Sequence, residues 1–234
     1  MPAKRLRVVV SVCCEVSHDE AVALIKAGRV MINGTPGALS DLVEMTDRVT
    51  LDGNEISAAV PMVYVLFHKP RGTECTMNPE IPENLLTVFH YPHRLFPVGR
   101  LDKESEGLLL MTNDGRLYHK VAHAGNKQEK EYYVELNRPF TGEFIDTMKN
   151  GVGILNTTTD PCDVFPIAEK PNAFRIILRQ GMNRQIRRMC HNLGYSVHKL
   201  VRTRIMHMQL GNLKAGEWRT LSDEELQVLK ITGA

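Results

Sequence analysis

The chain has 234 residues, of which 43% are hydrophobic, and its formal net charge is +2. That length allows a hydrophobic core and one or two domains. No run of eighteen apolar residues occurs, which excludes a membrane-spanning helix of ordinary length, and the five cysteines include no CxxC pair, which argues against a disulfide scaffold or a zinc finger. Free thiols are typical of a reducing compartment, so we expect a cytoplasmic protein.

Residues 1–60 are predicted to form a small domain of their own. Ser17 and Glu20 form a capping box at the start of a helix over 21–27, and Gly28 is the stop of this helix. Apolar residues recur along the segment at helical spacing, which supports this assignment.

The rest of this domain is predicted to contain short strands. A strand over 29–32 leads into an Asn33-Gly34 turn, and a second strand covers 49–51. Residues 7–10 are mostly β-branched, which predicts a weak helix. The pattern resembles the S4 RNA-binding domain and implies a divergent S4-like domain; the alternative is a structural remnant that packs on the main domain.

Strands and helices interleave from 62 to 234, after a linker predicted at 57–61 from its small residues and proline. This order predicts an α+β domain with a mixed, largely antiparallel sheet flanked by helices. The predicted strands are 64–67, 108–111, 131–135, 174–178 and 197–201. The predicted helices are 140–149, 184–193 and one that starts at a Ser222 capping box, and a turn is predicted at Asn113-Asp114-Gly115.

Basic residues are concentrated late in the chain. The segment 170–216 contains ten Lys and Arg residues and no Asp or Glu. Charge of one sign over this length predicts a local positive field, which is typical of a protein with a polyanion partner such as RNA. The alternative is a solvated face whose acidic residues come from elsewhere in the fold.

The segment 99–115 places Asp102 in a glycine-bounded loop between Arg100 and Lys103. Neighbouring cations favour the ionised form of a carboxyl group, so Asp102 is a candidate nucleophile, whereas an ordinary loop would hold a solvated charge cluster. This run resembles the active-site motif of pseudouridine synthases, the enzymes that isomerise uridine in RNA, in the branch typified by the ribosomal small-subunit synthase A. The resemblance implies a pseudouridine synthase fold over 62–234, with Asp102 as the catalytic aspartate.

Two further segments resemble motifs of the same family. In 130–134, the resemblance implies that Tyr132 stacks on the uracil; a half-buried strand aromatic is the alternative. In 181–189, it implies that Arg187, two positions after a glutamine, pairs with Asp102. A carboxylate in a dry pocket requires a paired cation, and the planar guanidinium suits a bidentate pair.

The target uridine must be extruded from folded RNA, which costs a few kcal/mol and requires side chains that hold the distorted backbone. The loop 69–72 resembles a supporting loop of the family. The candidate RNA-binding residues are Arg100, Lys103, Asn183, Arg184, Gln185 and Arg188.

Pseudouridine formation only rearranges atoms, so we expect no cofactor and no metal. His119 and His123 have helical spacing but lack a third ligand nearby. The segments 199–206 and 216–219 resemble large-subunit enzymes of the branch. This resemblance implies large-subunit rRNA as substrate, with a tRNA uridine as the alternative.

Two other classes of protein were weighed against this prediction. A non-catalytic RNA-binding or ribosome-assembly factor would have no need of Asp102, Tyr132 and Arg187 together. A glycosidase requires two catalytic carboxylates, and the acid-free segment does not suit a neutral sugar. We expect a monomer, since no apolar dimer stripe is evident, and no membrane association.

Overall fold

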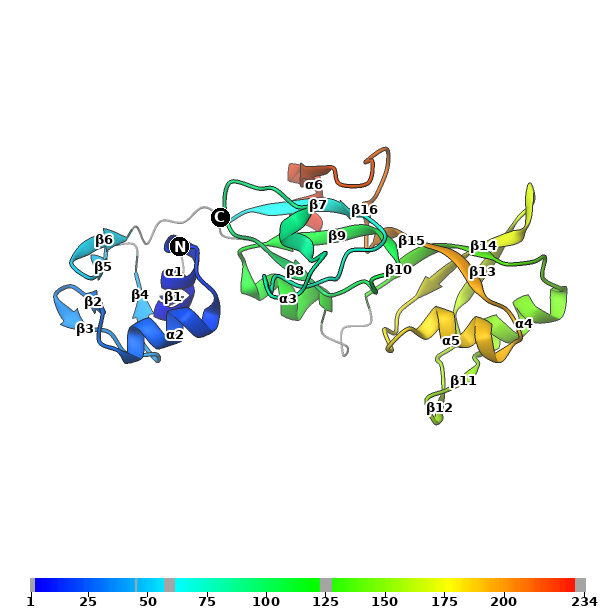
Figure 1. The fold of residues 1–234 in the computed structure, drawn as a ribbon, viewed down its shortest axis with the longest axis horizontal. Helices are drawn as coiled ribbons and strands as arrows, with labels where there is room; N and C mark the ends of the chain where they lie inside the picture. Colours follow the sequence, from blue (N-terminus) through cyan, green and yellow to red (C-terminus); the bar gives the residue numbers. More distant parts are fainter. Residues whose placement is uncertain (1–2, 45, 57–61, 123–127, 230–234) are drawn as a thin grey trace. The chain divides into compact units, whose positions relative to one another are not determined.

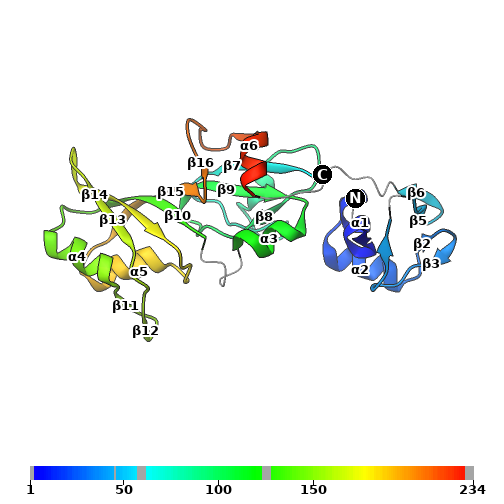
Figure 2. The ribbon, with the colours of Figure 1, turned by 180° about the vertical axis from the view of Figure 1, so that it is seen from behind.

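The computed structural model describes residues 3–44, 46–56, 62–122 and 128–229. The chain divides into two compact units, which are drawn with their elements in Figures 1 and 2. Unit 1 comprises Met1–Val63, Tyr91–Leu95 and Leu226–Ala234, and unit 2 comprises Tyr64–His90 and Phe96–Glu225. The linker predicted at 57–61 lies outside the described residues. None of the described helices has the length and apolar character needed to cross a lipid bilayer.

Unit 1 contains the helices α1 (Leu6–Cys13) and α2 (His18–Lys26). The prediction of a weak helix at residues 7–10 is wrong, because this segment lies within the well-formed α1. Leu6, Val9 and Val10 are buried in one core with residues of α2, and this packing outweighs the low helix propensity of valine.

The predicted capping box of α2 is confirmed. The Ser17 backbone N–H donates to Glu20 Oε2 over 2.6 Å, and the Glu20 N–H donates to Ser17 Oγ over 3.1 Å. Gly28 follows the helix with a φ of +69°, a left-handed conformation that glycine adopts without steric cost. Local hydrogen bonds therefore define both ends of this helix.

The strands of unit 1 form two small sheets. Their bounds are β1 (Lys4–Arg5), β2 (Val30–Ile32), β3 (Thr35–Pro36), β4 (Leu42–Val43), β5 (Val49–Leu51) and β6 (Asn54–Ile56). One sheet has the order β3-β2-β5-β6, and β1 pairs with β4. The predicted Asn33-Gly34 turn is confirmed: both residues have positive φ, +51° and +83°, as a tight hairpin turn requires.

Unit 2 is built on a twisted sheet with the order β13-β14-β10-β15-β9-β7-β17. The bounds are β7 (Tyr64–Lys69), β8 (Phe96–Val98), β9 (Glu106–Thr112), β10 (Lys130–Leu136), β13 (Asp163–Ile167), β14 (Lys170–Leu178), β15 (Val197–Ile205), β16 (Met208–Gln209) and β17 (Trp218–Thr220). In addition, β8 pairs with β9 and β16 pairs with β15. Of the described strand pairs in this sheet, β9 with β15 is parallel and the others are antiparallel. The predicted α+β class is confirmed.

The remaining described helices are η1 (Leu85–Thr87), α3 (Gly115–Ala122), α4 (Gly142–Asn150), α5 (Gln185–Asn192) and α6 (Asp223–Val228), and a small hairpin joins β11 (Gly153–Ile154) to β12 (Thr157–Thr158). The helices α4 and α5 cover one face of the sheet. Phe144 and Met148 of α4 and Met189 of α5 share a core cluster with Phe174 and Ile176 of β14. Figures 1 and 2 show both helices beneath β10, β13 and β14.

The prediction of a turn at Asn113-Asp114-Gly115 is wrong at its last residue, because Gly115 begins α3. The Asp114 carboxylate accepts from the Arg116 backbone N–H over 3.0 Å and from the Arg116 guanidinium, and Tyr64 Oη donates to it over 2.8 Å. Burial alone would raise the pKa of Asp114, but the hydrogen bonds from Arg116 and Tyr64 outweigh it and lower the pKa. Asp114 therefore holds the start of α3 to β7.

The parallel contact between β9 and β15 depends on Gly107, which pairs with Arg202. A Cβ atom at Gly107 would lie 2.4 Å from the Arg202 carbonyl oxygen and 2.6 Å from its nitrogen, and its φ is +114°. A side chain at this position is therefore excluded by both contact and conformation.

Replacing Asp114 by Asn should lower the free energy of unfolding by about 2–3 kcal/mol near neutral pH, because it leaves Arg116 and Tyr64 without their charged acceptor. The folded state depresses this pKa, so wild type holds the contribution above the unfolded-state value of about 4 and loses it as the pH falls through the folded-state pKa. Urea denaturation from neutral to acidic pH should show the two proteins converge. Tyr64→Phe, which removes one bond, should cost about 1 kcal/mol; a pH-independent gap would contradict this account.

Gly107→Ala should lower the free energy of unfolding by about 1–3 kcal/mol or more, because the added methyl group pushes β9 from β15. Gly153→Ala is the matched control, since no atom lies within 4 Å of the added Cβ and its φ is not positive. Thermal denaturation of both variants measures the difference. Equal stabilities of the Gly107→Ala and Gly153→Ala variants would show that β9 and β15 accommodate the methyl group at no cost.

Candidate active site

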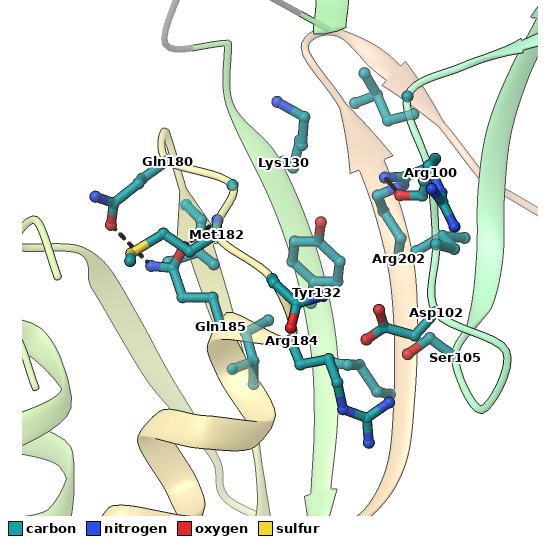
Figure 3. Close-up of a pocket in the computed structure, with 18 of the residues that line it drawn as sticks. Arg100, Asp102, Ser105, Lys130, Tyr132, Gln180, Met182, Arg184, Gln185 and Arg202 are labelled. Atoms are coloured by element: carbon teal, nitrogen blue, oxygen red, sulfur yellow. Dashed lines mark hydrogen bonds between the residues drawn. The ribbon is translucent and has the colours of Figure 1, made fainter. Parts of the chain in front are cut away.

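A cavity of about 630 Å³ opens in unit 2 beside the sheet (Figure 3). One side is the loop 98–105, which leads into β9, and the other is the segment 178–186, which leads from β14 into α5. Side chains of β10 and β15 contribute the wall between them. The two segments predicted to carry the catalytic motifs thus face each other across one cavity.

Asp102 lies in the loop and lines this cavity in a half-buried position. The Ser105 N–H donates to the Asp102 carbonyl over 3.0 Å, and the Gly72 N–H donates to the Lys103 carbonyl over 2.8 Å, so the backbone of the loop is tied down. The Asp102 carboxylate has no hydrogen bond or ion pair with the described residues. Figure 3 shows it directed into the same space as Tyr132.

Tyr132 lies on β10 and lines the cavity. Alternation along the strand directs Tyr132 to the face covered by helices, where it packs against their core. Tyr133 points to the opposite face, where its hydroxyl donates to Glu135 over 2.9 Å. Of the two tyrosines, Tyr132 is thus the one available to a base in the cavity.

Arg187 does not form the predicted pair with Asp102, nor does it line the cavity. Its Nη2 donates to the Glu104 carbonyl over 3.0 Å and to Ser105 Oγ over 3.3 Å, and its Nη1 donates to the Val197 carbonyl over 3.3 Å. The reason is its place in the first turn of α5, from which the side chain reaches the backbone beneath the loop. Arg187 therefore supports the loop that carries Asp102.

Five of the six predicted RNA-binding residues line the cavity: Arg100, Lys103, Asn183, Arg184 and Gln185. Lys103 pairs with Glu83 and Arg184 with Glu104, each over 2.7 Å, and both cations remain partly exposed. Arg184 has a φ of +51°, an unusual conformation for a residue with a side chain, at the turn into α5.

Gln185 and Arg188 have structural roles in this turn. Gln185 is 5% exposed; its Oε1 accepts from the Met182 N–H over 3.0 Å and its Nε2 donates to Gln180 over 3.1 Å. Arg188 lies outside the cavity and donates to the carbonyl and the side chain of Asn183. Both residues therefore shape the loop that faces Asp102.

The positive field predicted for 170–216 is largely compensated by acidic residues from earlier in the chain. The pairs are Lys170 with Glu135, Arg175 with Glu131, Arg179 with Glu129 and Asp163, Arg184 with Glu104, Lys199 with Glu106, and Arg204 with Glu129 and Glu131. Most of these acids lie on β9, on β10 or directly before them, strands that neighbour β15. Most of this segment therefore fits the alternative prediction, a solvated face whose acidic partners come from elsewhere in the fold.

Two cations in the cavity wall were missed as site residues. Arg202 is 2% exposed; its Nε donates to the Leu108 carbonyl over 2.7 Å and its Nη1 to the Arg100 carbonyl over 3.3 Å, while Nη2 has no hydrogen-bond partner. Lys130 donates to the Gln128 carbonyl over 2.9 Å. Burial, and secondly the charge of Arg202, lower the pKa of Lys130 to about 8. One available signal was the position of Lys130 two residues before Tyr132, on the same strand face.

The sequence matches the family described as RNA pseudouridylate synthase over residues 63–192. It is 45% identical to the dual-specificity RNA pseudouridine synthase RluF of Salmonella typhi, over 90% of this chain and 73% of that protein. It is 44% identical to RluF of Escherichia coli K12, over 90% and 72% of the two chains. The ribosomal large subunit pseudouridine synthase B of Bacillus subtilis is 29% identical over 97% and 96%.

The fold is similar to that of a solved protein as well. A crystal structure of a pseudouridylate synthase aligns with a TM-score of 0.68 and 25% sequence identity, over 96% of this chain and 99% of the other. The shared fold agrees with the pseudouridine synthase architecture expected from the motif around Asp102. The chain belongs to the RNA pseudouridine synthase family.

Proposed function

We propose that this protein converts a specific uridine of large-subunit rRNA to pseudouridine, with Asp102 as the nucleophile. The substrate is favoured by the similarity to the large-subunit synthase B and by the resemblance of residues 199–206 and 216–219 to large-subunit synthase F, within the branch typified by small-subunit synthase A. The RluF relatives are described as dual-specificity enzymes, so a second RNA substrate is a further candidate. A tRNA is the second substrate to be tested.

The observation that supports this role is the Asp102 carboxylate, which has no partner in the described part of the chain and faces Tyr132 across the cavity. Isomerisation breaks the bond between C1′ and N1 of uridine and joins C1′ to C5, which needs an anionic oxygen near the sugar and a flat surface for the turning base. Stacking of the base on Tyr132 would contribute about 1–3 kcal/mol. Attack of Asp102 on C1′ and attack on C6 of the base both fit this arrangement.

Arg187 is proposed to act through the loop and not through direct contact with substrate. Its three hydrogen bonds join α5 and β15 to the Glu104 carbonyl and the Ser105 hydroxyl, which fixes the position of the neighbouring Asp102. A displacement of about 1 Å at a reacting group can cost about 10²-fold in rate. Arg187 is therefore a positioning residue.

RNA phosphates are proposed to bind the cations at the rim of the cavity. Arg100 is exposed, and Lys103 and Arg184 are bound to single carboxylates at the surface. Exposed ion pairs contribute about 0–1 kcal/mol, so a phosphate can replace the carboxylate at small cost. Asn183 and Arg188, joined by two hydrogen bonds, would present the same edge to the RNA backbone.

We further propose that unit 1 is a divergent S4-like domain and that the protein is a cytoplasmic monomer that works without cofactor or metal. The helix pair α1 and α2 beside a small antiparallel sheet supports the S4-like assignment. Arg29 in this unit pairs with Asp52, which reduces the charge available for RNA. His123, weighed earlier as a metal ligand, lies outside the described residues.

Asp102→Asn should abolish isomerisation, with a loss of at least about 10³-fold in turnover, while folding and RNA affinity stay near wild type. Tritium release from a large-subunit rRNA transcript labelled at uridine C5 measures turnover, and filter binding measures affinity. Asp146→Asn is the matched control, because Asp146 is exposed on α4 outside the cavity. Turnover near wild type in the Asp102 variant would contradict the assignment of Asp102 as the nucleophile. The same assay on a tRNA transcript tests the second substrate.

Arg187→Met should lower the rate at saturating RNA by about 10- to 100-fold, because the loop around Asp102 loses its hydrogen bonds to α5. Single-turnover tritium release gives this rate, and thermal denaturation shows whether the protein remains folded. Arg138→Met serves as control, since the Arg138 guanidinium is exposed and donates to the Gly194 carbonyl outside the cavity. A wild-type rate in the Arg187 variant would rule out the positioning role.

A further inference from the structure

We propose that Lys130 is a further catalytic residue, whose ammonium group contacts the uracil oxygen that becomes negatively charged during the reaction, with Arg202 as a positioning residue behind it. This inference rests on the proposed function and adds a role that neither Asp102 nor Tyr132 fills. It is drawn from the distribution of positive charge within the cavity.

The cations of the cavity fall into two groups. Lys103, Arg179 and Arg184 each pair with a carboxylate, and Arg100 is exposed to solvent. In the second group, Arg202 is buried and Lys130 is half-buried, and neither pairs with a carboxylate of the described residues. A charge held in this way is costly unless an anion joins it.

The hydrogen bonds of these two residues leave donor capacity unused. The Lys130 ammonium group, which has three donors, donates to the Gln128 carbonyl. The Arg202 guanidinium is fixed by the carbonyls of Leu108 and Arg100, and its Nη2 is buried without a partner. Arg202 therefore supplies a fixed positive charge in the wall, whereas Lys130 has free donors for a ligand.

The strand register places both cations around the surface expected to stack on the base. Lys130 and Tyr132 lie two residues apart on the same face of β10, and Arg202 lies opposite Tyr132 on β15. In Figure 3, Lys130 lies above Tyr132 and Asp102 below it. A uridine with its sugar at Asp102 and its base on Tyr132 directs the base edge to Lys130.

Negative charge develops on the base by either route open to Asp102. If a carboxylate oxygen bonds to C1′, the C1′–N1 bond breaks and its electron pair remains on the uracil, delocalised over N1, O2 and O4. If it bonds to C6, the electron pair of the C5–C6 double bond shifts to O4 as an enolate. On either route the C1′–N1 bond breaks, C1′ bonds to C5, and the bond between carbon and Asp102 breaks to release the free carboxylate. The C5 proton then leaves and N1 gains one, so substrate and product are isomers.

A cation that faces this charge in a site shielded from water stabilises the transition state more than the bound substrate. Water would otherwise have to solvate the anion, and the stacked base excludes it from one face. The low pKa of Lys130 agrees with a site that lacks an anion until substrate binds. Charge development on uracil supplies that missing partner.

The experiment compares Lys130→Met, Lys130→Arg and wild type on the C5-tritiated large-subunit rRNA transcript. Lys149→Met is the matched control, because Lys149 is exposed on α4 outside the cavity. Tritium release by wild type is measured first, so a failure of the proposed function appears before any variant is judged. The rate constant at saturating RNA, the Kd and the Tm are then determined for each variant.

We expect Lys130→Met to lower the rate constant at saturating RNA by about 10²-fold, a size typical for loss of one donor to a developing oxyanion. Kd and Tm should stay near wild type, and Lys130→Arg should recover most of the rate because it restores the charge. Three results would overturn the inference: a Lys130→Met rate within a few-fold of wild type, a change confined to Kd, which indicates a phosphate site, or Lys130→Arg as slow as Lys130→Met.

Discussion

The contact between Gly107 on β9 and Arg202 on β15 is the constraint on which the site depends. The absence of a side chain at Gly107 lets the two strands pair in parallel, with Arg202 backbone atoms where a Cβ would lie. The Arg202 side chain then reaches the carbonyls of Leu108 and Arg100, so it joins β9 to the loop that carries Asp102. On its other side β15 pairs with β10, where Arg202 lies opposite Tyr132. The pairing of these strands thereby places Asp102 near Tyr132 and Lys130.

Charge in this molecule is arranged by depth. Lys170, Arg175 and Lys199 have half-exposed side chains and meet carboxylates from β9 and β10, which are distant in sequence but close in the sheet. Inside the cavity wall, Lys130 and Arg202 have no such partners among the described residues. Exposed pairs are weak and exchange readily with phosphate, whereas a buried or half-buried cation that lacks a carboxylate favours an anion. Binding of RNA and catalysis on its base thus draw on different sets of cations.

The sequence allowed correct prediction where a feature depends on local interactions. The α2 capping box and the Asn33-Gly34 turn follow from a few neighbouring residues, and strand alternation identified most of the large sheet. Prediction failed where distant contacts decide. Tertiary packing makes α1 helical, and two of the three partners of Arg187 are backbone carbonyls that no motif encodes. Lys130 was missed because its importance comes from the carboxylates it lacks, which only the folded charge pattern shows.

The pattern of bonds around Asp102 explains why the two nearby arginines hold backbone carbonyls and not the carboxylate. A bidentate pair would occupy the lone pairs that Asp102 needs to attack carbon and would stabilise the ground state. Arg187 and Arg202 instead fix the loop through Glu104 and Arg100, on either side of Asp102, so the carboxylate is placed without being neutralised. The cost is a buried nitrogen without a hydrogen-bond partner on each arginine. Among the described residues, the Asp102 carboxylate has no partner and Lys130 pairs with no carboxylate, so the substrate completes the electrostatics of the site.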